Sequence, residues 1–183
     1  MRLFWEYGYQ GASIDQLCRE TRMPRASLYQ RFGDKQGLFL ATIEHYATTR
    51  VSRVLGHLAA EPLEAALAGF YEAVCVLATE EADARGCLIS CVLADAAGSN
   101  ARFRGELEMR FTRMEARLVE RLAHAQGRGE LAAQAEPAAL ATVVAAVARG
   151  IMVRARAGAP IAALRTIAKT TSQMLLNTHS HHA

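Results

Sequence analysis

The chain has 183 residues, of which 51% are hydrophobic, and its formal net charge is +3. This composition supplies enough apolar side chains for a helical core in one or two small domains. No segment alternates apolar and polar residues as a strand does, and no apolar run reaches the roughly 20 residues of a membrane span, so we expect neither a β fold nor a membrane protein.

The excess positive charge lies in the N-terminal third of the chain. Residues 1–56 contain eight Lys and Arg against five Asp and Glu, and the rest of the chain is balanced. Positive charge placed in this way favours contact with the phosphates of a nucleic acid. A surplus of three charges is too small to decide the matter alone.

The first strongly patterned segment begins at Ser13. Ser13 and Gln16 have the spacing of a capping box, in which each side chain satisfies a free backbone donor of the first helical turn. Pro24 has no N–H and restricts Met23, so we expect the helix to end before this pair. Apolar or small side chains follow the helical spacing of three and four at Ile14, Leu17, Cys18 and Thr21.

A second short helix follows the corner at Pro24. Leu28 and Phe32 are four residues apart and define its buried face, which leaves polar side chains outside. Gly33 ends it, and Asp34 can cap a third helix that begins at Lys35. Two short helices that meet at a corner are the helix-turn-helix arrangement, whose second helix enters the major groove of DNA.

The outward side chains of the second helix suit base edges. The Arg25 guanidinium matches guanine, the Ala26 methyl matches the thymine methyl, and the Gln30 amide matches adenine. Backbone phosphates are expected to contact hydroxyl groups and charges at Ser13, Ser27, Tyr29, Arg31 and Lys35. The alternatives are that Tyr29 packs against the preceding helix and that Arg31 and Lys35 are ordinary solvated charges.

Residues 3–39, LFWEYGYQGASIDQLCRETRMPRASLYQRFGDKQGLF, also resemble the N-terminal signature of TetR-type transcriptional regulators. The shared features are the LF…GY helix end, a small residue before Ser-Ile, and the pattern xxLYxxFxxKxxL. The resemblance implies a homodimeric repressor that binds a palindromic double-stranded DNA operator and responds to a small-molecule effector. It assigns Tyr29 and Lys35 to the DNA backbone.

The chain departs from the family pattern in two places. Pro24 stands where a capping Ser is usual, so the second helix begins without a side-chain cap. Family members also extend further upstream of the first helix. We therefore expect either a short first helix or a start that lies further upstream.

The remainder of the chain reads as helices separated by Pro and Gly, which gives an all-α fold of about nine helices. We place a helix-turn-helix DNA-binding domain at 1–46 and a helical effector-binding and dimerisation domain at 47–183. From Lys35 onward, the expected helices are 35–57, 62–79, 87–97, 100–126, 137–157 and 161–177.

An effector pocket is expected between the helices at 62–79, 87–97, 100–126 and 137–157. Its candidate lining is aromatic and sulfur-containing, and the shortage of charged residues at positions expected to be buried indicates an apolar effector. The residues are Phe70, Tyr71, Cys75, Cys87, Cys91, Phe103, Phe111, Met114 and Met152. The alternative is that these residues form ordinary core.

The cysteines leave three interpretations open. Cys87 and Cys91 are four residues apart on one expected helix, and Cys75 lies on the helix before it. They can be buried packing residues, a redox or electrophile switch, or a soft-metal site. None has zinc-finger spacing, so we expect no metal and no cofactor, with reduced thiols in the cytoplasm. A histidine cluster at 179–182 reads as a frayed end.

The last two helices are expected to form a dimer interface as a four-helix bundle around a two-fold axis. Small Ala, Val and Gly residues at 138–158 allow close helix approach. The expected contacts are Val143, Val144, Val147, Ile151, Ile161, Leu164, Ile167 and Leu175. The alternative is that both helices serve only the core of one protomer.

The chain shows no metal-ligand spacing, no Gly-rich phosphate loop and no nucleophile beside a base, so we do not expect an enzyme. A helical interaction protein without DNA binding remains the alternative to a DNA-binding regulator.

Overall fold

The structure is a computed structural model that describes residues 1–81 and 85–177. Within these residues it is entirely helical, and the histidine cluster at 179–182 lies outside them. The elements are α1 (Arg2–Gly11), α2 (Ile14–Thr21), α3 (Arg25–Phe32), α4 (Lys35–Tyr46), η1 (Ala47–Val51), α5 (Ser52–Gly56), η2 (His57–Ala59), α6 (Leu63–Thr79), η3 (Leu88–Leu93), α7 (Ala94–Ala97), α8 (Ala101–Gly127), α9 (Pro137–Arg156) and α10 (Ile161–Asn177).

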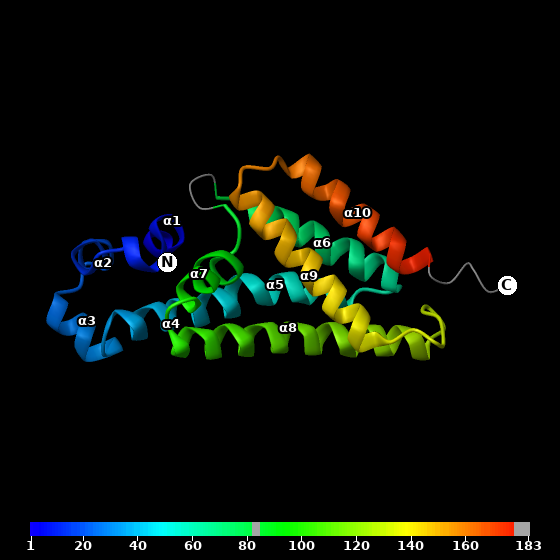
Figure 1. Ribbon diagram of the computed structural model, residues 1–183, viewed down its shortest axis with the longest axis horizontal. Helices are drawn as coiled ribbons and strands as arrows, with labels where there is room; N and C mark the ends of the chain where they lie inside the picture. Colours follow the sequence, from blue (N-terminus) through cyan, green and yellow to red (C-terminus); the bar gives the residue numbers. More distant parts are fainter. Residues whose placement is uncertain (82–84, 178–183) are drawn as a thin grey trace.

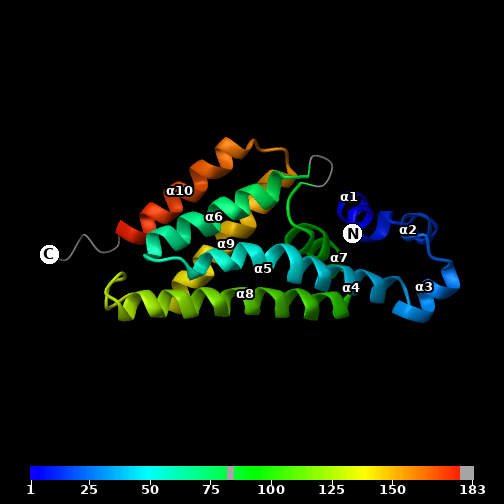
Figure 2. The ribbon, with the colours of Figure 1, turned by 180° about the vertical axis from the view of Figure 1, so that it is seen from behind.

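The molecule is elongated, with α1, α2 and α3 grouped at one end and the helices of the body behind them (Figure 1). Seen from the opposite side, α4 and α5 run from this head along the body beside α8 (Figure 2). Since α4 to η2 follow one another without a break, as do η3 and α7, the described residues form nine continuous helical segments. The all-α prediction is confirmed, and the segment expected at 35–57 is one continuous rod.

The head folds as local chemistry predicts. Ser13 and Gln16 form the reciprocal capping box of α2: the Gln16 N–H donates to the Ser13 hydroxyl over 3.2 Å, and the Ser13 N–H donates to the Gln16 side-chain oxygen over 2.9 Å. Arg22 takes a left-handed conformation (φ 54°) and ends α2, and α3 then begins after Pro24 without a side-chain cap. Asp34 caps α4 by accepting from the Gly37 N–H at 2.7 Å.

The rod contains a π-helical turn, η1, at its centre. Hydroxyls in and beside it bond to backbone carbonyls four residues earlier: Thr48 to Glu44 at 3.0 Å, and Thr49 to His45 at 2.6 Å. Such bonds compete with regular helical pairing. A second π-helical segment, η3, packs against α4 beside this turn, and turns of this kind are frequent at functional sites.

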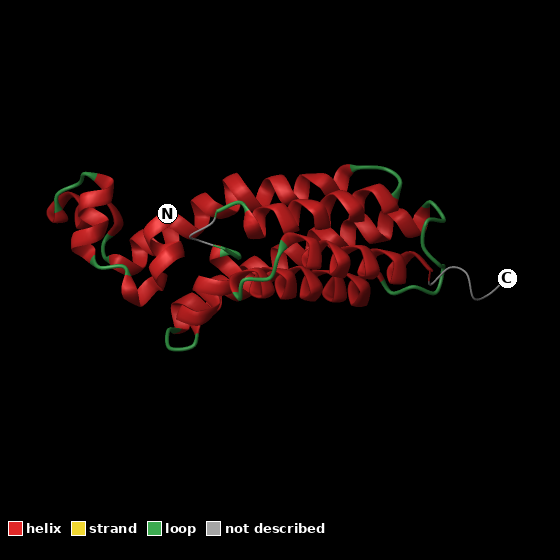
Figure 3. Ribbon diagram, turned by 90° about the horizontal axis from the view of Figure 1, so that it is seen from above, coloured by secondary structure: helices red, strands yellow, loops and turns green. Residues whose placement is uncertain are grey.

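The body is built around α9, which packs against α6, α8 and α10, while α10 also packs on α6. Seen from above, helices joined by short loops make up the described part of the chain (Figure 3). Asn100 caps α8 by accepting from the Arg102 and Phe103 N–H groups, and Pro137 occupies the first turn of α9. Among the described helices, α9 alone is long and apolar enough to cross a membrane by composition. Core helices share this property, and seven side chains of α9 are buried inside the protein.

Aromatic rings join the head to the body. Phe39 packs edge-on against Phe4 and Phe103, with ring centroids 5.0 and 5.2 Å apart, and Tyr9 lies 4.8 Å from Phe103. Burial of such rings stabilises the junction strongly, and edge-to-face pairs add about 0.5–1.5 kcal/mol each. Phe103, which we expected to line an effector pocket, is fully buried on α8 and packs against Tyr9 and Phe39 at this junction.

Candidate nucleic-acid interface and effector cavities

The exposed face of α3 carries the side chains expected to read DNA. Leu28 is fully buried and holds α3 on the head, whereas Arg25, Ala26 and Gln30 are exposed. An outward guanidinium, methyl and amide on one short helix can contact three neighbouring base edges in a major groove. The structure therefore presents these groups as the helix-turn-helix prediction requires.

Arg25 is held by a neighbour in this structure. Its Nη2 lies 3.3 Å from Asp15 Oδ1, and both side chains are more than half exposed. Exposed pairs of this kind contribute about 0–1 kcal/mol, so a guanine edge can replace the carboxylate at little cost. Arg31 lies over the ring of Phe32, with its guanidinium carbon 5.5 Å from the ring centroid.

The residues expected to contact phosphates differ in their exposure and in the hydrogen bonds that they already form. Ser27 and Tyr29 are exposed, and Tyr29 is 38% accessible. The Ser13 hydroxyl is exposed but engaged in the capping box. Lys35 is half-buried, donates to the Gln10 carbonyl at 3.3 Å and lies 4.8 Å from the Tyr9 ring centroid.

Burial lowers the pKa of Lys35 from its ordinary value. Lys35, Tyr9 and Tyr29 line an open hollow of about 420 Å³ at the start of α4. A cation, phenolic hydroxyls and the first turn of a helix are the groups that contact a DNA phosphate. The hollow lies at the end of α3, where the DNA backbone would pass if α3 occupied the groove.

The chain matches two family models, "Bacterial regulatory proteins, tetR family" over residues 1–42 and "Tetracyclin repressor-like, C-terminal domain" over residues 64–171. The second match covers more than half of the chain. The chain belongs to the TetR family. It is a DNA-binding transcriptional regulator and not an enzyme.

Individual relatives agree over most of the length. The HTH-type transcriptional repressor ComR of Escherichia coli K12 is 28% identical over 176 residues, which are 95% of this chain and 84% of ComR. A cysteine mutant of the TetR family regulator CifR, solved with 26-bp operator DNA, is 26% identical with a TM-score of 0.84, over 93% of this chain and 90% of that one. A TetR regulator from Rhodobacter sphaeroides is 27% identical with a TM-score of 0.82, over 94% and 92% of the two chains.

Two adjacent cavities lie inside the body of this TetR-family chain. The inner one, about 50 Å³, lies between α5, α6, η3, α8 and α9, and the outer one, about 270 Å³, lies between α4, η1, α5, η3 and α8. Both π-helical segments contribute to these walls. The residues common to both cavities are Val51, Leu55, Cys87, Ser90 and Met114.

Five of the predicted lining residues border these cavities. Phe70 and Met152 line the inner cavity, Phe111 lines the outer one, and Cys87 and Met114 line both. Tyr71 instead borders a groove between α6 and α10, where its hydroxyl donates to the Val144 carbonyl at 3.2 Å. The rod residues Val51, Val54 and Leu55 were missed because the expected pocket had no wall from residues 47–55. Ser90 and Arg149 lie on expected walls but were missed because only aromatic and sulfur-containing side chains were chosen there.

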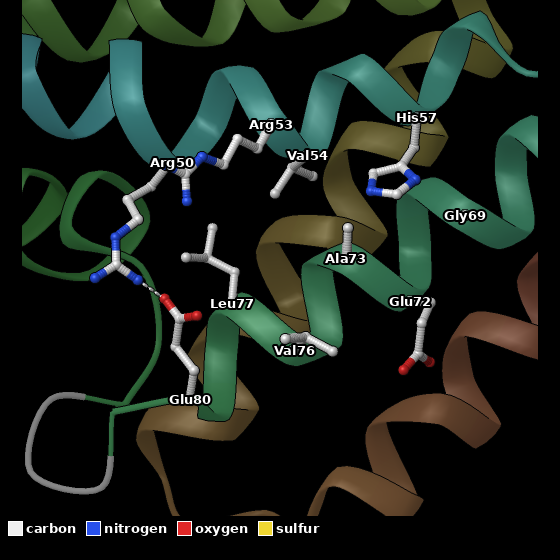
Figure 4. Close-up of a pocket in the computed structure, with 10 residues that line it drawn as sticks. All are labelled: Arg50, Arg53, Val54, His57, Gly69, Glu72, Ala73, Val76, Leu77 and Glu80. Atoms are coloured by element: carbon white, nitrogen blue, oxygen red, sulfur yellow. Dashed lines mark ion pairs between the residues drawn. The ribbon is translucent and has the colours of Figure 1, made fainter.

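A third hollow, about 340 Å³, opens on the outer surface between α5 and α6 (Figure 4). Arg50 forms an ion pair with Glu80 at one end, and His57 and Gly69 lie at the other. Val54 and Leu77 line both this groove and the inner cavity. These two side chains therefore form the partition between the interior and the solvent-exposed groove.

The thiols differ in environment. Cys75 is fully buried, and burial raises its pKa to about 11. Cys91 is half-buried, its pKa is raised by burial, and its thiol lies 3.8 Å from the Met152 carbonyl oxygen. A raised pKa lowers the thiolate fraction and so opposes reactivity at these two positions. Within the described residues, no three His, Cys, Asp or Glu side chains are grouped as metal ligands.

The close packing around Cys91 depends on Gly86, which has φ +87°. A Cβ at this position would lie 2.8 Å from the Met152 carbonyl oxygen and 2.9 Å from the Cys91 sulfur. Only glycine therefore fits here without a shift of the backbone or of the thiol.

The surface of α9 and α10 requires a correction to the expected dimer contacts. Four of those side chains are buried within the protomer itself and have no surface to offer: Val144, Ile151, Leu164 and Leu175. Val147, Ile161 and Ile167 are half-buried, and Val143 is 49% exposed. The apolar surface also includes Val153 and Met174, which are 53% and 67% exposed and were not predicted.

Proposed function

We propose that this chain is a homodimeric repressor that binds a palindromic operator through α3 and releases it when a small molecule occupies the inner and outer cavities. The main support for this proposal is the outer face of α3, which exposes Arg25, Ala26 and Gln30. Buried Leu28 anchors the same helix. The operator complex of the relative CifR supports it.

The proposal assigns residues 1–46 to DNA binding and residues 47–183 to effector binding and dimerisation. The boundary lies at the start of η1, the π-helical turn that also borders the outer cavity. A rod that runs from the head to the cavity wall offers a direct mechanical path between the two sites. The proposal also places the protein in the cytoplasm, together with its operator.

Two copies are required on geometric grounds. A single α3 reads few base pairs, and two heads spaced by one helical turn of DNA, about 34 Å, double the site. The exposed Val143, Val153 and Met174 on α9 and α10 supply an apolar surface suited to a two-fold contact.

Selection from a random duplex library, with the purified full chain, tests the proposal. We expect enrichment of one sequence motif with two-fold symmetry, bound by one dimer, with an affinity that falls steeply as salt is raised. Binding without any enriched motif would contradict sequence-specific regulation, and an enriched motif without symmetry would contradict the dimer.

A further inference from the structure

Arg22, in the corner between α2 and α3, has a backbone conformation that side-chain-bearing residues rarely adopt. Its φ is +54°, and it is the one residue other than glycine with a positive φ in the part of the chain that the structure describes. The end of α2 imposes this conformation, because the Met23 N–H donates to the Cys18 carbonyl at 3.1 Å and so turns the chain back on the helix. A left-handed residue that closes a helix in this way is usually glycine, since a Cβ crowds the carbonyl oxygen that follows it.

No contact within the protomer offsets this cost. The side chain of Arg22 is exposed, and among the described residues it forms no ion pair and no hydrogen bond, whereas Arg25 pairs with Asp15. Glycine at the same position would form the same helix end without the crowding. An unfavourable backbone conformation whose side chain has no partner in the folded chain favours a role for that side chain outside it.

The corner lies at the outer tip of the head, away from the body (Figure 1). In a helix-turn-helix the first helix crosses the DNA backbone while the second lies in the major groove, so the corner that joins them lies beside that backbone. The first N–H groups of α3 have no side-chain cap, because Pro24 supplies none, and free N–H groups of this kind bind phosphate. An unpaired guanidinium and uncapped N–H groups therefore lie at the same corner.

We propose that Arg22 binds a phosphate of the DNA backbone at the corner that leads into α3. This inference rests on the proposed role of α3 as the reading helix and adds to it a contact that none of the expected DNA-binding residues supplies. A phosphate contact strengthens binding to every duplex and carries no sequence information. Arg22 therefore contributes affinity and salt dependence, but no base preference.

Three substitutions separate the charge of Arg22 from its backbone conformation. Arg22→Gly removes the charge and the crowding, Arg22→Asn removes the charge but keeps a side chain that tolerates the left-handed region, and Arg22→Lys keeps a cation. Dissociation constants are measured with the full chain by fluorescence anisotropy on two labelled duplexes, the motif enriched from the random library and a scrambled duplex of the same composition. Melting temperatures are measured on the same samples.

Loss of one phosphate contact in each protomer should make the plot of log affinity against log salt shallower by about 1.8, or 0.9 per contact. The ratio of the Arg22→Gly Kd to the parent Kd should therefore fall about sevenfold between about 0.05 M and 0.15 M salt. Arg22→Asn should behave in the same way, Arg22→Lys should keep the parent slope, and the preference for the motif over the scrambled duplex should not change in any variant.

Arg22→Gly should also melt at the parent temperature or slightly above it, because relief of the crowding outweighs the greater freedom of the unfolded chain. Weaker DNA binding by a variant that is at least as stable cannot be ascribed to unfolding. Arg117→Gln, on an exposed stretch of α8, removes the same charge and should leave the salt slope unchanged.

Parent-like affinity and salt slope in Arg22→Gly and Arg22→Asn would overturn the inference, as would an equal loss in Arg117→Gln, which would assign the effect to net charge. A changed preference for the motif would mean that Arg22 reads a base, and a lower melting temperature in both Arg22→Gly and Arg22→Asn would mean that it stabilises the fold; either result contradicts the phosphate assignment. A parent protein that enriches no motif refutes the proposed function and this inference together. A parent that enriches one while the Arg22 variants bind as it does refutes only the Arg22 contact.

Discussion

Arg156, at the end of α9, donates a hydrogen bond from Nη1 to the backbone carbonyl of Trp5 in α1 over 2.8 Å. The same nitrogen lies 3.4 Å from the carbonyl oxygen of Arg85. One turn earlier on α9, Met152 forms part of the inner cavity wall. The Arg156 guanidinium therefore connects the first helix of the head directly to the helix that lines the cavities.

Loss of this contact should destabilise the protein measurably. We expect Arg156→Met to lower the free energy of unfolding by about 1 kcal/mol, because a charged donor bonded to a carbonyl is lost at a partly exposed site. Urea denaturation followed by circular dichroism measures the change. Arg154→Met, on the same exposed turn, is the control, and equal losses in the two variants would show that the Trp5 contact contributes nothing.

The reading helix makes a separate prediction about sequence preference. Arg25→Ala and Gln30→Ala should each cost about 1–3 kcal/mol of operator affinity and relax the preference at one base-pair position. Lys35→Ala should instead weaken binding to all duplexes alike and make the salt dependence shallower, because it removes a phosphate contact. Titrations of labelled duplexes at several salt concentrations separate the two patterns.

Arg117→Ala, in the exposed middle of α8, serves as the control for general loss of positive charge. An unchanged base preference in both Arg25→Ala and Gln30→Ala would exclude α3 as the reading helix. Asp15→Asn provides a further check, because it frees Arg25 from its 3.3 Å ion pair and should not weaken operator binding.

Dimerisation should depend on the exposed apolar surface of α9 and α10. A carboxylate placed there by Val153→Glu or Met174→Glu should yield a folded monomer, because burial of an unpaired charge opposes association. Sedimentation equilibrium gives the mass, and operator binding should fall with it. Val76→Glu is the matched control on α6, where Val76 is 42% exposed; dissociation in this variant as well would point to a different interface.

The helices were predictable because their ends are set locally. Ser13, Asn100 and Pro137 each act within one turn of chain, and the expected boundaries agree with the structure to within a residue or two. The exposed face of α3 was predictable for the same reason, since the four-residue spacing of Leu28 and Phe32 determines it.

The cavity walls were not predictable from such patterns. Val51 and Arg149 lie almost a hundred residues apart in the chain, and only the tertiary arrangement of the rod and α9 around the inner cavity brings both into one lining. The dimer contacts were hard to select for a related reason. Val144 and Ile151 of α9 face the protomer's own core while Val143 lies at the surface, and hydrophobicity alone does not distinguish these positions.

The thiols provide a test of the switch interpretation. Burial raises the pKa of Cys75 and Cys91, so we expect both to react with iodoacetamide at pH 7.5 much more slowly than half-exposed Cys18. Mass spectrometry of peptides after timed labelling measures each rate, with urea-unfolded protein as the control in which the rates converge. Faster labelling of Cys91 than of Cys18 in the native protein would favour a reactive switch.

Glu130 should make the stability of the folded protein depend on pH. Its Oε2 accepts from the Leu63 N–H at 2.5 Å and so satisfies the start of α6, where Pro62 supplies no side-chain cap. Its other oxygen accepts from Arg128 Nε at 2.9 Å. The Leu63 bond first, and then the Arg128 bond, hold the pKa of this carboxyl below its usual value.

A carboxyl with a lowered folded-state pKa stabilises the protein above its unfolded-state pKa of about 4.3, and this contribution is lost as pH falls through the folded-state value. Glu130→Gln should therefore have a lower melting temperature than the parent protein at pH 7. The difference should shrink as pH falls below about 4.3 and through the folded-state pKa, where the parent carboxyl becomes neutral like the amide. Melting temperatures across this range measure the effect, with the exposed Glu108→Gln as the control. A difference that stays constant as the parent carboxyl titrates would mean that the Glu130 charge does not stabilise the folded state.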